Sequence, residues 1–184
     1  DMEGSRGLGD VYKRQVKQGL LKQTQAKIRD GTAINPISVV VESVNQGGFH
    51  TRISMRDHVI VSDQPYGFTG TNKGPKPSEL VLAALAACQE TTWRIYAEDM
   101  GITIEKISVT LTGTQDLRGF MSLDKNVPSG FTSIEGEVHL ETRASEEELE
   151  QLQIVVDQHC PVLDDLTRPV SVNLRVNRIG PASG

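Results

Sequence analysis

The sequence predicts a single α+β domain in which antiparallel strands and helices are segregated along the chain. Residues 37–62 read as short strands separated by turns, and apolar and polar residues alternate with a period of two in the strand segments within 102–142. An alanine-rich apolar stretch at 79–100 is too long for a strand, and a second helical pattern covers 146–160. The predicted order is β-β-β-α-β-β-α-β, which differs from the regular alternation of a doubly wound sheet.

Length and charge exclude several classes of protein. The 184 residues are enough for one hydrophobic core of ordinary size. The net charge is −5 and the basic residues are scattered, which argues against a nucleic-acid partner. The apolar run Leu80–Ala87 is far shorter than the ~20 residues of a membrane span, and no charged-then-apolar leader opens the chain. We therefore expect a cytoplasmic protein with no membrane partner.

Residues 1–30 differ from the rest and are predicted to be a peripheral amino-terminal segment. They carry seven Lys or Arg against four Asp or Glu. Val11–Arg29 has the apolar spacing of an amphipathic helix, whereas Asp1–Gly9 has no periodicity and is interpreted as a partly non-native start. Residues 31–184 then form the folded domain.

The first strands form a three-strand meander followed by a long loop. The predicted strands and turns are Ile37–Val44, a turn at Gln46–Gly48, Phe49–Met55, a turn at Arg56–Asp57, and His58–Ser62. A loop rich in Pro, Gly, Thr and Asn covers Asp63–Pro77 and is long enough to have a function of its own.

A long central helix is predicted from Glu79 to Met100. Ser78 is the predicted N-cap, Glu79 complements the positive helix end, and Gly101 ends the helix as a left-handed cap. The alanine-rich first half allows neighbouring elements to approach closely.

The carboxyl-terminal half is predicted as a hairpin, a helix and a final strand. The predicted ranges are the strands Ile102–Thr112 and Gly130–Thr142, a helix capped by Ser145 and ending at Cys160 before Pro161, a turn or short helix at Val162–Leu166, and a strand at Pro169–Val176. Ser145 and Glu148 have the spacing of a capping box.

Cys88 and Cys160 are the candidate reactive residues. Two cysteines are too few for a disulfide scaffold, neither belongs to a Cys-x-x-Cys pair, and the four histidines lack metal-ligand spacing. We therefore expect thiol chemistry with no metal and no cofactor. Cys88 shares a helix face with Thr91 and Thr92, and packing of a buried thiol among alanines is the alternative. Cys160 ends its helix, where the dipole would raise a thiol pKa, so Cys88 is predicted to attack while Cys160 resolves or packs.

Three short motifs in this order resemble the OsmC/Ohr family of thiol-dependent peroxidases, over roughly three quarters of the chain (Ile37–Arg178). They are Gln64-Pro65-Tyr66-Gly67-Phe68, the run Gly74-Pro75-Lys76-Pro77-Ser78-Glu79-Leu80 leading into the helix with Cys88, and His159-Cys160-Pro161-Val162.

The resemblance implies an intertwined homodimer whose antiparallel sheets wrap around two central helices, so that residues 31–184 form an OsmC-like domain. It implies an organic hydroperoxide substrate, a peroxidatic thiol at Cys88 and a resolving thiol at Cys160. In the family mechanism Cys88 forms a sulfenic acid and then a disulfide with Cys160, which a dithiol reductant such as a lipoyl group reopens.

The chain departs from the family pattern at two positions. The peroxidases have a glutamate ten residues before the reactive cysteine, where this chain has Ser78, and Glu79 would lie roughly 13 Å from Cys88 along the helix. No arginine aligns in the loop after Phe68, where the family has one that stabilises the thiolate. The alternative is an OsmC-like protein without efficient peroxidase activity that binds a small apolar ligand or serves a structural role.

Overall fold

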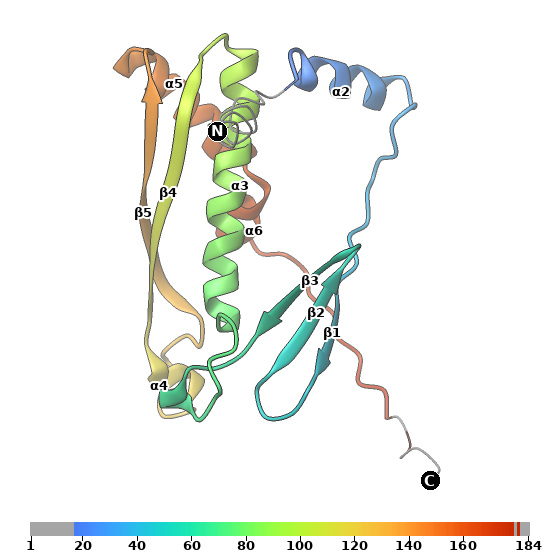
Figure 1. The fold of residues 1–184 in the computed structure, drawn as a ribbon, viewed down its shortest axis with the longest axis vertical. Coiled ribbons are helices and arrows are strands. Elements are labelled where there is room, and N and C mark those ends of the chain that lie inside the picture. The colour runs from blue at the N-terminus through green and yellow to red at the C-terminus, as the bar shows by residue number, and fades with distance from the viewer. Residues whose placement is uncertain (1–16, 179, 181–184) are drawn as a thin grey trace, which may run out of the picture.

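The computed structural model describes residues 17–178 and 180, and shows an α+β fold in which helix α3 lies between two separate antiparallel sheets (Figure 1). In chain order the elements are α2 (Leu20–Arg29), β1 (Glu42–Asn45), β2 (Thr51–Met55), β3 (His58–Ser62), the 3₁₀ turn η1 (Tyr66–Phe68), α3 (Pro77–Asp99), β4 (Ile104–Gln115), α4 (Leu117–Phe120), β5 (Phe131–Thr142), α5 (Glu146–His159) and α6 (Pro161–Thr167).

The three-strand meander is confirmed, with a shorter first strand. β1, β2 and β3 pair antiparallel in that order. The turn between β1 and β2 uses positive φ angles at Gly47 (114°) and Gly48 (55°), which glycine adopts without steric cost. Pairing begins at Glu42, and residues 37–41 of the predicted strand have no strand partner within the described chain.

Helix α3 is the 23-residue central helix, and it begins two residues earlier than predicted. Lys76 is the N-cap and Pro77 is the first helical residue, where the missing proline N–H is no loss. The Glu79 carboxylate accepts a hydrogen bond from the Lys76 backbone N–H at 2.9 Å, so Glu79 serves the helix end and Ser78 is not the cap. Gly101, with φ 74°, follows the helix end as predicted.

The predicted hairpin is confirmed as the long antiparallel pair β4 and β5. Its inward-facing residues pack against α3 and α5 around one apolar cluster. The buried members of this cluster are Trp93, Ala97, Ile102, Ile104, Leu152 and Val156. The core therefore lies between the two-stranded sheet and the helices, while the three-stranded sheet stands apart from it (Figure 1).

The predicted capping box of α5 is confirmed. The Ser145 hydroxyl accepts from the Glu148 backbone N–H at 3.3 Å, and the Glu148 carboxylate accepts from the Ser145 backbone N–H at 2.8 Å. α5 ends at His159, and Cys160 joins it directly to α6, which begins at Pro161.

The predicted last strand at Pro169–Val176 is wrong for the single chain. Residues 169–178 form neither helix nor strand, because no sheet edge of the same chain supplies the backbone partners that a strand needs. Their alternating side chains are exposed, with Val172 at 75%, Leu174 at 90% and Val176 at 99%. The observed order follows the predicted one through α5 and through α6, which lies at the predicted turn or short helix Val162–Leu166, and departs from it at the final strand.

The amino-terminal helix is present as α2 over Leu20–Arg29, while residues 11–16 of that predicted helix and the segment Asp1–Gly9 lie outside the described residues. α2 is tied to the end of α3, since Lys22 pairs with Asp99 at 3.4 Å. The division of the chain at residue 30 stays a prediction.

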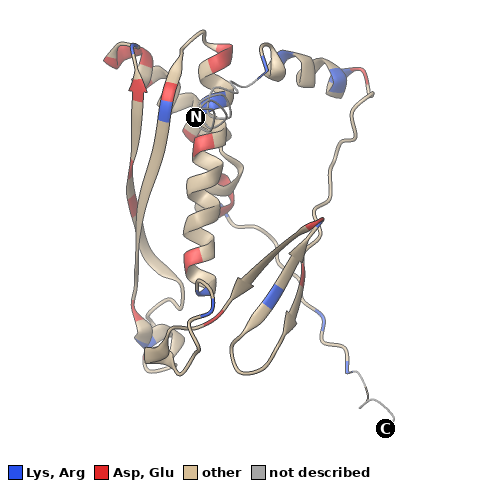
Figure 2. Cartoon of the chain, viewed as in Figure 1, with Lys and Arg blue, Asp and Glu red and all other residues tan. Residues whose placement is uncertain are grey.

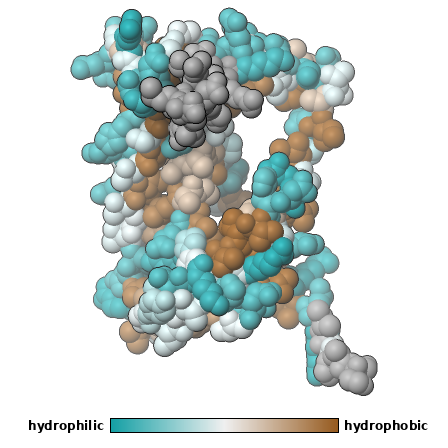
Figure 3. Space-filling model, in the orientation of Figure 1, coloured by the Kyte–Doolittle hydropathy of each residue, from teal (hydrophilic) through white to brown (hydrophobic). Residues whose placement is uncertain are grey.

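Charged and apolar residues are distributed differently over the surface. Lys and Arg lie singly on several elements and form no continuous stripe in Figure 2. Figure 3 shows apolar surface at the position of β3 and along the extended segment that precedes β1. That segment exposes Ile34 by 85% and Ile37 by 73%. Within residues 17–178, no helix combines the length and the apolar character that crossing a bilayer requires.

Candidate functional site

One buried face of α5 positions Cys160 against the central helix α3. Leu152, Val156 and Cys160 follow one another at four-residue spacing on one face, and all three are fully buried. Both α5 and α6 contact α3. Because Cys160 is the junction of these two helices, packing of this face fixes the position of its thiol against α3.

The structure brings the two cysteines together. Cys88 and Thr92, both on α3, lie near enough to the Cys160 thiol to shift its pKa. Both cysteines are free thiols, Cys88 half-buried and Cys160 buried. Two groups separated by seventy-two positions in the sequence are therefore close in space, with the more accessible sulfur on α3.

Several neighbours act on the Cys160 thiol, and their net effect raises its pKa. The largest cause is burial, which disfavours the charged thiolate. The Leu163 backbone N–H opposes this by hydrogen-bonding the sulfur, Cys88 raises the pKa further through its hydrogen bond and charge, and the Thr92 hydroxyl lowers it. The direction of the pKa shift is as predicted, and burial is its largest cause.

The helix face around Cys88 explains why Thr92 lies near Cys160. Thr92 lies one turn after Cys88, and its hydroxyl donates to the Cys88 carbonyl oxygen at 2.8 Å. Thr92 is buried, as are Leu85 and Gln89 on the same side of α3. The sequence indicates that Thr92 shares the face of Cys88 without giving it a role, and the structure adds that Thr92 lowers the pKa of Cys160.

Within the described chain, no lysine or arginine is among the groups that shift the pKa of Cys160. Four arginines of the described chain contact other groups. Arg52 donates to Ser54, Arg94 to the Ile104 carbonyl, Arg118 to Asp116 and Arg168 to Asp164. Lys73 and Lys76 precede or open α3, at least roughly 18 Å from Cys88 along the helix axis. Among the described residues, Cys160 therefore lacks a cation that would favour its thiolate.

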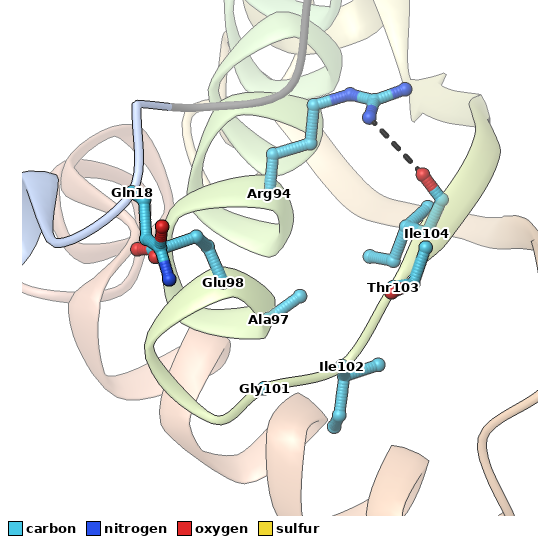
Figure 4. Close-up of a pocket in the computed structure, with 8 residues that line it drawn as sticks. All are labelled: Gln18, Arg94, Ala97, Glu98, Gly101, Ile102, Thr103 and Ile104. Carbon is cyan, nitrogen blue, oxygen red and sulfur yellow. Dashed lines mark hydrogen bonds between the residues drawn. The ribbon is translucent and has the colours of Figure 1, made fainter. Parts of the chain in front are cut away.

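Figure 4 shows where one of these arginines lies. The side chain of Arg94 borders a cavity of about 310 Å³ near the end of α3, and its guanidinium reaches the Ile104 carbonyl oxygen at 3.4 Å. Glu98, in the same cavity, accepts from the Gly19 backbone N–H at 2.9 Å. Arg94 and Glu98 therefore connect α3 with β4 and with the segment before α2, away from the two sulfurs.

Asp63 organises the loop that precedes α3. Its carboxylate accepts hydrogen bonds from the Thr71 hydroxyl at 2.5 Å and from the backbone N–H groups of Gln64, Thr71 and Lys73. The Thr71 hydroxyl is the main reason that the pKa of Asp63 falls to about 2. Sequence reasoning missed Asp63, because an aspartate at a strand end has no distinctive pattern.

The same loop forms one wall of an apolar cavity of about 420 Å³ at the start of α3. Its apolar lining residues are Phe49, Phe68, Pro77, Leu117, Phe120 and Met121. Lys76 is the one charged residue among those that line it, and no acidic residue does so. Pro77 and Ser78 precede Cys88 by about three helical turns, so this cavity is separate from the thiol pair of the same chain.

His159 does not contact the Cys160 thiol within the described chain. Its Nδ1 lies 2.7 Å from the Val155 carbonyl oxygen, and its ring packs on Tyr96 with centroids 4.9 Å apart. His159 therefore interacts with the carboxyl-terminal end of α5. Trp93 is a core residue whose indole N–H donates to Gln89.

The sequence profile described as OsmC-like protein matches residues 70–175, which is more than half of the chain and includes both cysteines. The chain belongs to the OsmC-like protein family. The predicted family resemblance is thereby confirmed. No protein with a curated description matches the chain.

Solved structures of OsmC-like proteins have the same fold. An OsmC like protein from Mycoplasma pneumoniae is 23% identical, with a TM-score of 0.64 over 71% of this chain and 88% of the other. An OsmC-like protein of unknown function from Vibrio cholerae is 9% identical, with a TM-score of 0.60 over 71% and 94%. An organic hydroperoxide resistance protein OsmC from Legionella pneumophila is 20% identical, with a TM-score of 0.56 over 73% and 92%. At these identities the likeness establishes the fold alone.

Proposed function

We propose that this OsmC-like protein reduces organic hydroperoxides with Cys88 as the attacking thiol and Cys160 as the resolving thiol. The observation that carries the proposal is the proximity of the two free cysteines, since Cys88 on α3 lies near enough to the junction of α5 and α6 to raise the pKa of Cys160. Cys88 is the more accessible sulfur, whereas Cys160 is fully buried and its pKa is raised. This asymmetry favours attack by Cys88 and resolution by Cys160.

The proposed reaction has two steps. The Cys88 thiolate attacks the terminal peroxide oxygen, so that an S–O bond forms, the O–O bond breaks and the alkoxide leaves as an alcohol after taking up a proton. The Cys160 sulfur then attacks the Cys88 sulfenic acid, the S–S bond forms, and hydroxide leaves as water with the proton of the Cys160 thiol. A dithiol reductant, of which a lipoyl group is an example, restores both thiols by exchange.

The substrate class rests on the family and on the surroundings of the thiols. Among the structural neighbours, proteins from Legionella pneumophila and Elizabethkingia anophelis are named as organic hydroperoxide resistance proteins. In this chain the pair lies against the apolar face of α5 and the alanine-rich half of α3. An alkyl or aryl hydroperoxide suits such surroundings better than a charged peroxide.

We propose that the working form is a homodimer in which each chain completes the sheets of the other. Two apolar segments support this, residues 37–41 before β1 and 169–176 after α6, since they lack strand partners in the single chain and expose apolar side chains. Unpaired backbone and exposed valines are costly in water, and pairing with a second copy removes both costs. The cytoplasmic location stays a prediction.

The second candidate is a protein without efficient peroxidase activity that binds a small apolar ligand. Two observations favour it. No cation acts on Cys160 within the described residues, and a cavity of about 420 Å³ with an apolar lining opens at the start of α3. That volume falls in the range of small-molecule sites.

Titration with cumene hydroperoxide distinguishes the two functions. Rapid loss of two thiols per chain at one equivalent of peroxide, counted by mass, supports the peroxidase. Unchanged thiols under these conditions would refute it in favour of the ligand-binding protein.

Two variants assign the roles of the two cysteines. Cys88→Ser abolishes turnover, whereas Cys160→Ser still consumes one equivalent and stops at the sulfenic acid. If Cys88→Ser kept the activity of the native chain, the assignment of Cys88 as the attacking thiol would be wrong.

A further inference from the structure

We propose that the cavity at the carboxyl-terminal end of α3 binds a small zwitterion, namely a free amino acid whose ammonium group meets Glu98 and whose carboxylate meets Arg94 (Figure 4). The cavity has a volume of about 310 Å³, which lies at the lower end of the range of small-molecule sites. The site is independent of the two cysteines and of the proposed peroxidase reaction.

One oxygen of the Glu98 carboxylate lacks a hydrogen-bond donor. Oε1 accepts from the Gly19 backbone N–H at 2.9 Å, which joins α3 to the segment before α2. Oε2 is buried, and no group of the described chain donates a hydrogen bond to it. Such an acceptor is rare in folded proteins, because it has lost its hydrogen bonds to water and gained none in exchange. A ligand that donates a hydrogen bond to Oε2 removes this cost.

Arg94 brings an unpaired positive charge to the same cavity. Its guanidinium donates one long hydrogen bond, at 3.4 Å, to the Ile104 carbonyl oxygen. Arg94 and Glu98 are four residues apart on α3, a spacing at which opposite charges can pair. Among the described residues, neither of them forms an ion pair. Figure 4 shows the reason, since the guanidinium extends towards Ile104 and the carboxylate towards Gln18. The guanidinium therefore keeps N–H groups that a ligand carboxylate can accept from.

The two charges favour a ligand that carries both signs. A simple cation at Glu98 would meet the like charge of Arg94, and a simple anion at Arg94 would meet that of Glu98. A zwitterion satisfies both side chains at once. Its direction follows from the helix, because α3 ends at Asp99, directly after Glu98, and the carboxyl-terminal end of a helix attracts positive charge. The ammonium group therefore lies at Glu98, and the carboxylate lies one turn earlier, at Arg94.

The rest of the lining favours an aliphatic side chain and allows entry. Its apolar part consists of Ala97, Ile102 and Ile104. Gln18 borders the cavity next to Glu98 and is exposed. Within the described chain the Gln18 side chain makes no hydrogen bond, so it can rotate and admit an ammonium group to Oε2. Leucine, a small aliphatic amino acid, is therefore a suitable probe.

The first test titrates the unmodified full chain with three related molecules and follows its backbone amides by NMR. L-Leucine carries both charges, isoamylamine lacks the carboxylate, and 4-methylpentanoate lacks the ammonium group. L-Leucine shifts the amide signals of Gly19, Gly101 and Thr103 around the cavity, and leaves those of Gly47 and Gly48 in the distant β1–β2 turn in place. The two single-charge molecules bind at least about tenfold more weakly, because each loses one charge-assisted hydrogen bond.

The second test removes each charge of the site and measures the affinity for L-leucine by calorimetry. Glu98→Gln keeps an acceptor for the Gly19 N–H, and Arg94→Gln keeps a donor near β4, so both variants should fold. Each weakens binding about tenfold. Glu135→Gln and Arg52→Gln make the same charge changes at exposed positions outside the cavity and bind L-leucine like the unmodified chain.

Each outcome decides the proposal. If L-leucine leaves the signals of Gly19, Gly101 and Thr103 unchanged, there is no such site. If isoamylamine or 4-methylpentanoate binds as tightly as L-leucine, recognition of both charges is refuted. Undiminished affinity in Glu98→Gln or in Arg94→Gln would overturn the part assigned to that residue. No titration contains peroxide, so failure of the peroxidase reaction and failure of this site are separate results.

Discussion

Replacement of Leu152 by alanine tests whether α5 is held against α3 as the structure describes. Leu152 is fully buried in the cluster that contains Trp93, Ala97 and Val156. A leucine in such a position loses about 3–4 kcal/mol of unfolding free energy on truncation, because transfer and cavity costs add. Against a typical total of about 5–15 kcal/mol, this is a large fraction of the stability.

Ile154→Ala is the matched control. It removes the same number of carbon atoms from the same helix, but Ile154 is 51% exposed. The loss expected for an exposed side chain of this kind is below about 1 kcal/mol. The difference between the two variants therefore reports burial and not helix propensity, which changes in a similar way in both.

Urea unfolding followed by tryptophan fluorescence measures both losses. Trp93 is the only tryptophan of the chain and lies in the same cluster, so its emission reports the environment that Leu152 fills. All chains are compared at equal protein concentration, because dimerisation would add to the apparent stability. Equal losses for Leu152→Ala and Ile154→Ala would show that the burial described for α5 is wrong.

Three further predictions concern other parts of the chain. Ser145→Ala removes the α5 cap and lowers the unfolding free energy by about 1 kcal/mol in the same assay, whereas Ser145→Asp keeps it. Asp63→Asn weakens the hydrogen bonds that order residues 64–76, so limited proteolysis at pH 7 cleaves this loop faster than in the native chain. The pKa of Asp63 is about 2 in the folded protein against an ordinary 3.8. The Asp63 carboxylate therefore stabilises the loop fully above pH 3.8, and this stabilisation is lost as the pH falls towards 2. Amide hydrogen exchange of residues 64–76 in the native chain measures that loss. Leu174→Lys converts the proposed dimer into monomers by light scattering, since Leu174 is 90% exposed in one chain; an unchanged dimer mass would contradict the strand exchange.

Much of the fold could be predicted because its signals are local. The Ser145 to Glu148 capping box, the glycines between β1 and β2, and the alternation of β4 and β5 each depend on neighbours in the sequence, and each is found as predicted. The start of α3 was placed two residues late, because Pro77 was interpreted as the end of the loop although proline also suits the first helical position.

The strand predicted at Pro169–Val176 shows the limit of such signals. Its alternating pattern predicts the extended conformation and an apolar face, but a strand exists only where a second backbone accepts and donates its hydrogen bonds. Within one chain no edge does so for residues 169–178. Residues 37–41 show the same limit, because they were predicted as part of the first strand but β1 pairs only from Glu42 onward.

For the candidate site, the sequence by itself determined which two residues could be reactive and which helices carry them. Only the tertiary structure decided that Cys88 lies near enough to Cys160 to affect its pKa, and that burial is the main cause of the raised pKa of Cys160. The physical reason is that a helix pattern specifies a face, while the partner of that face and its exclusion of water depend on how distant elements pack.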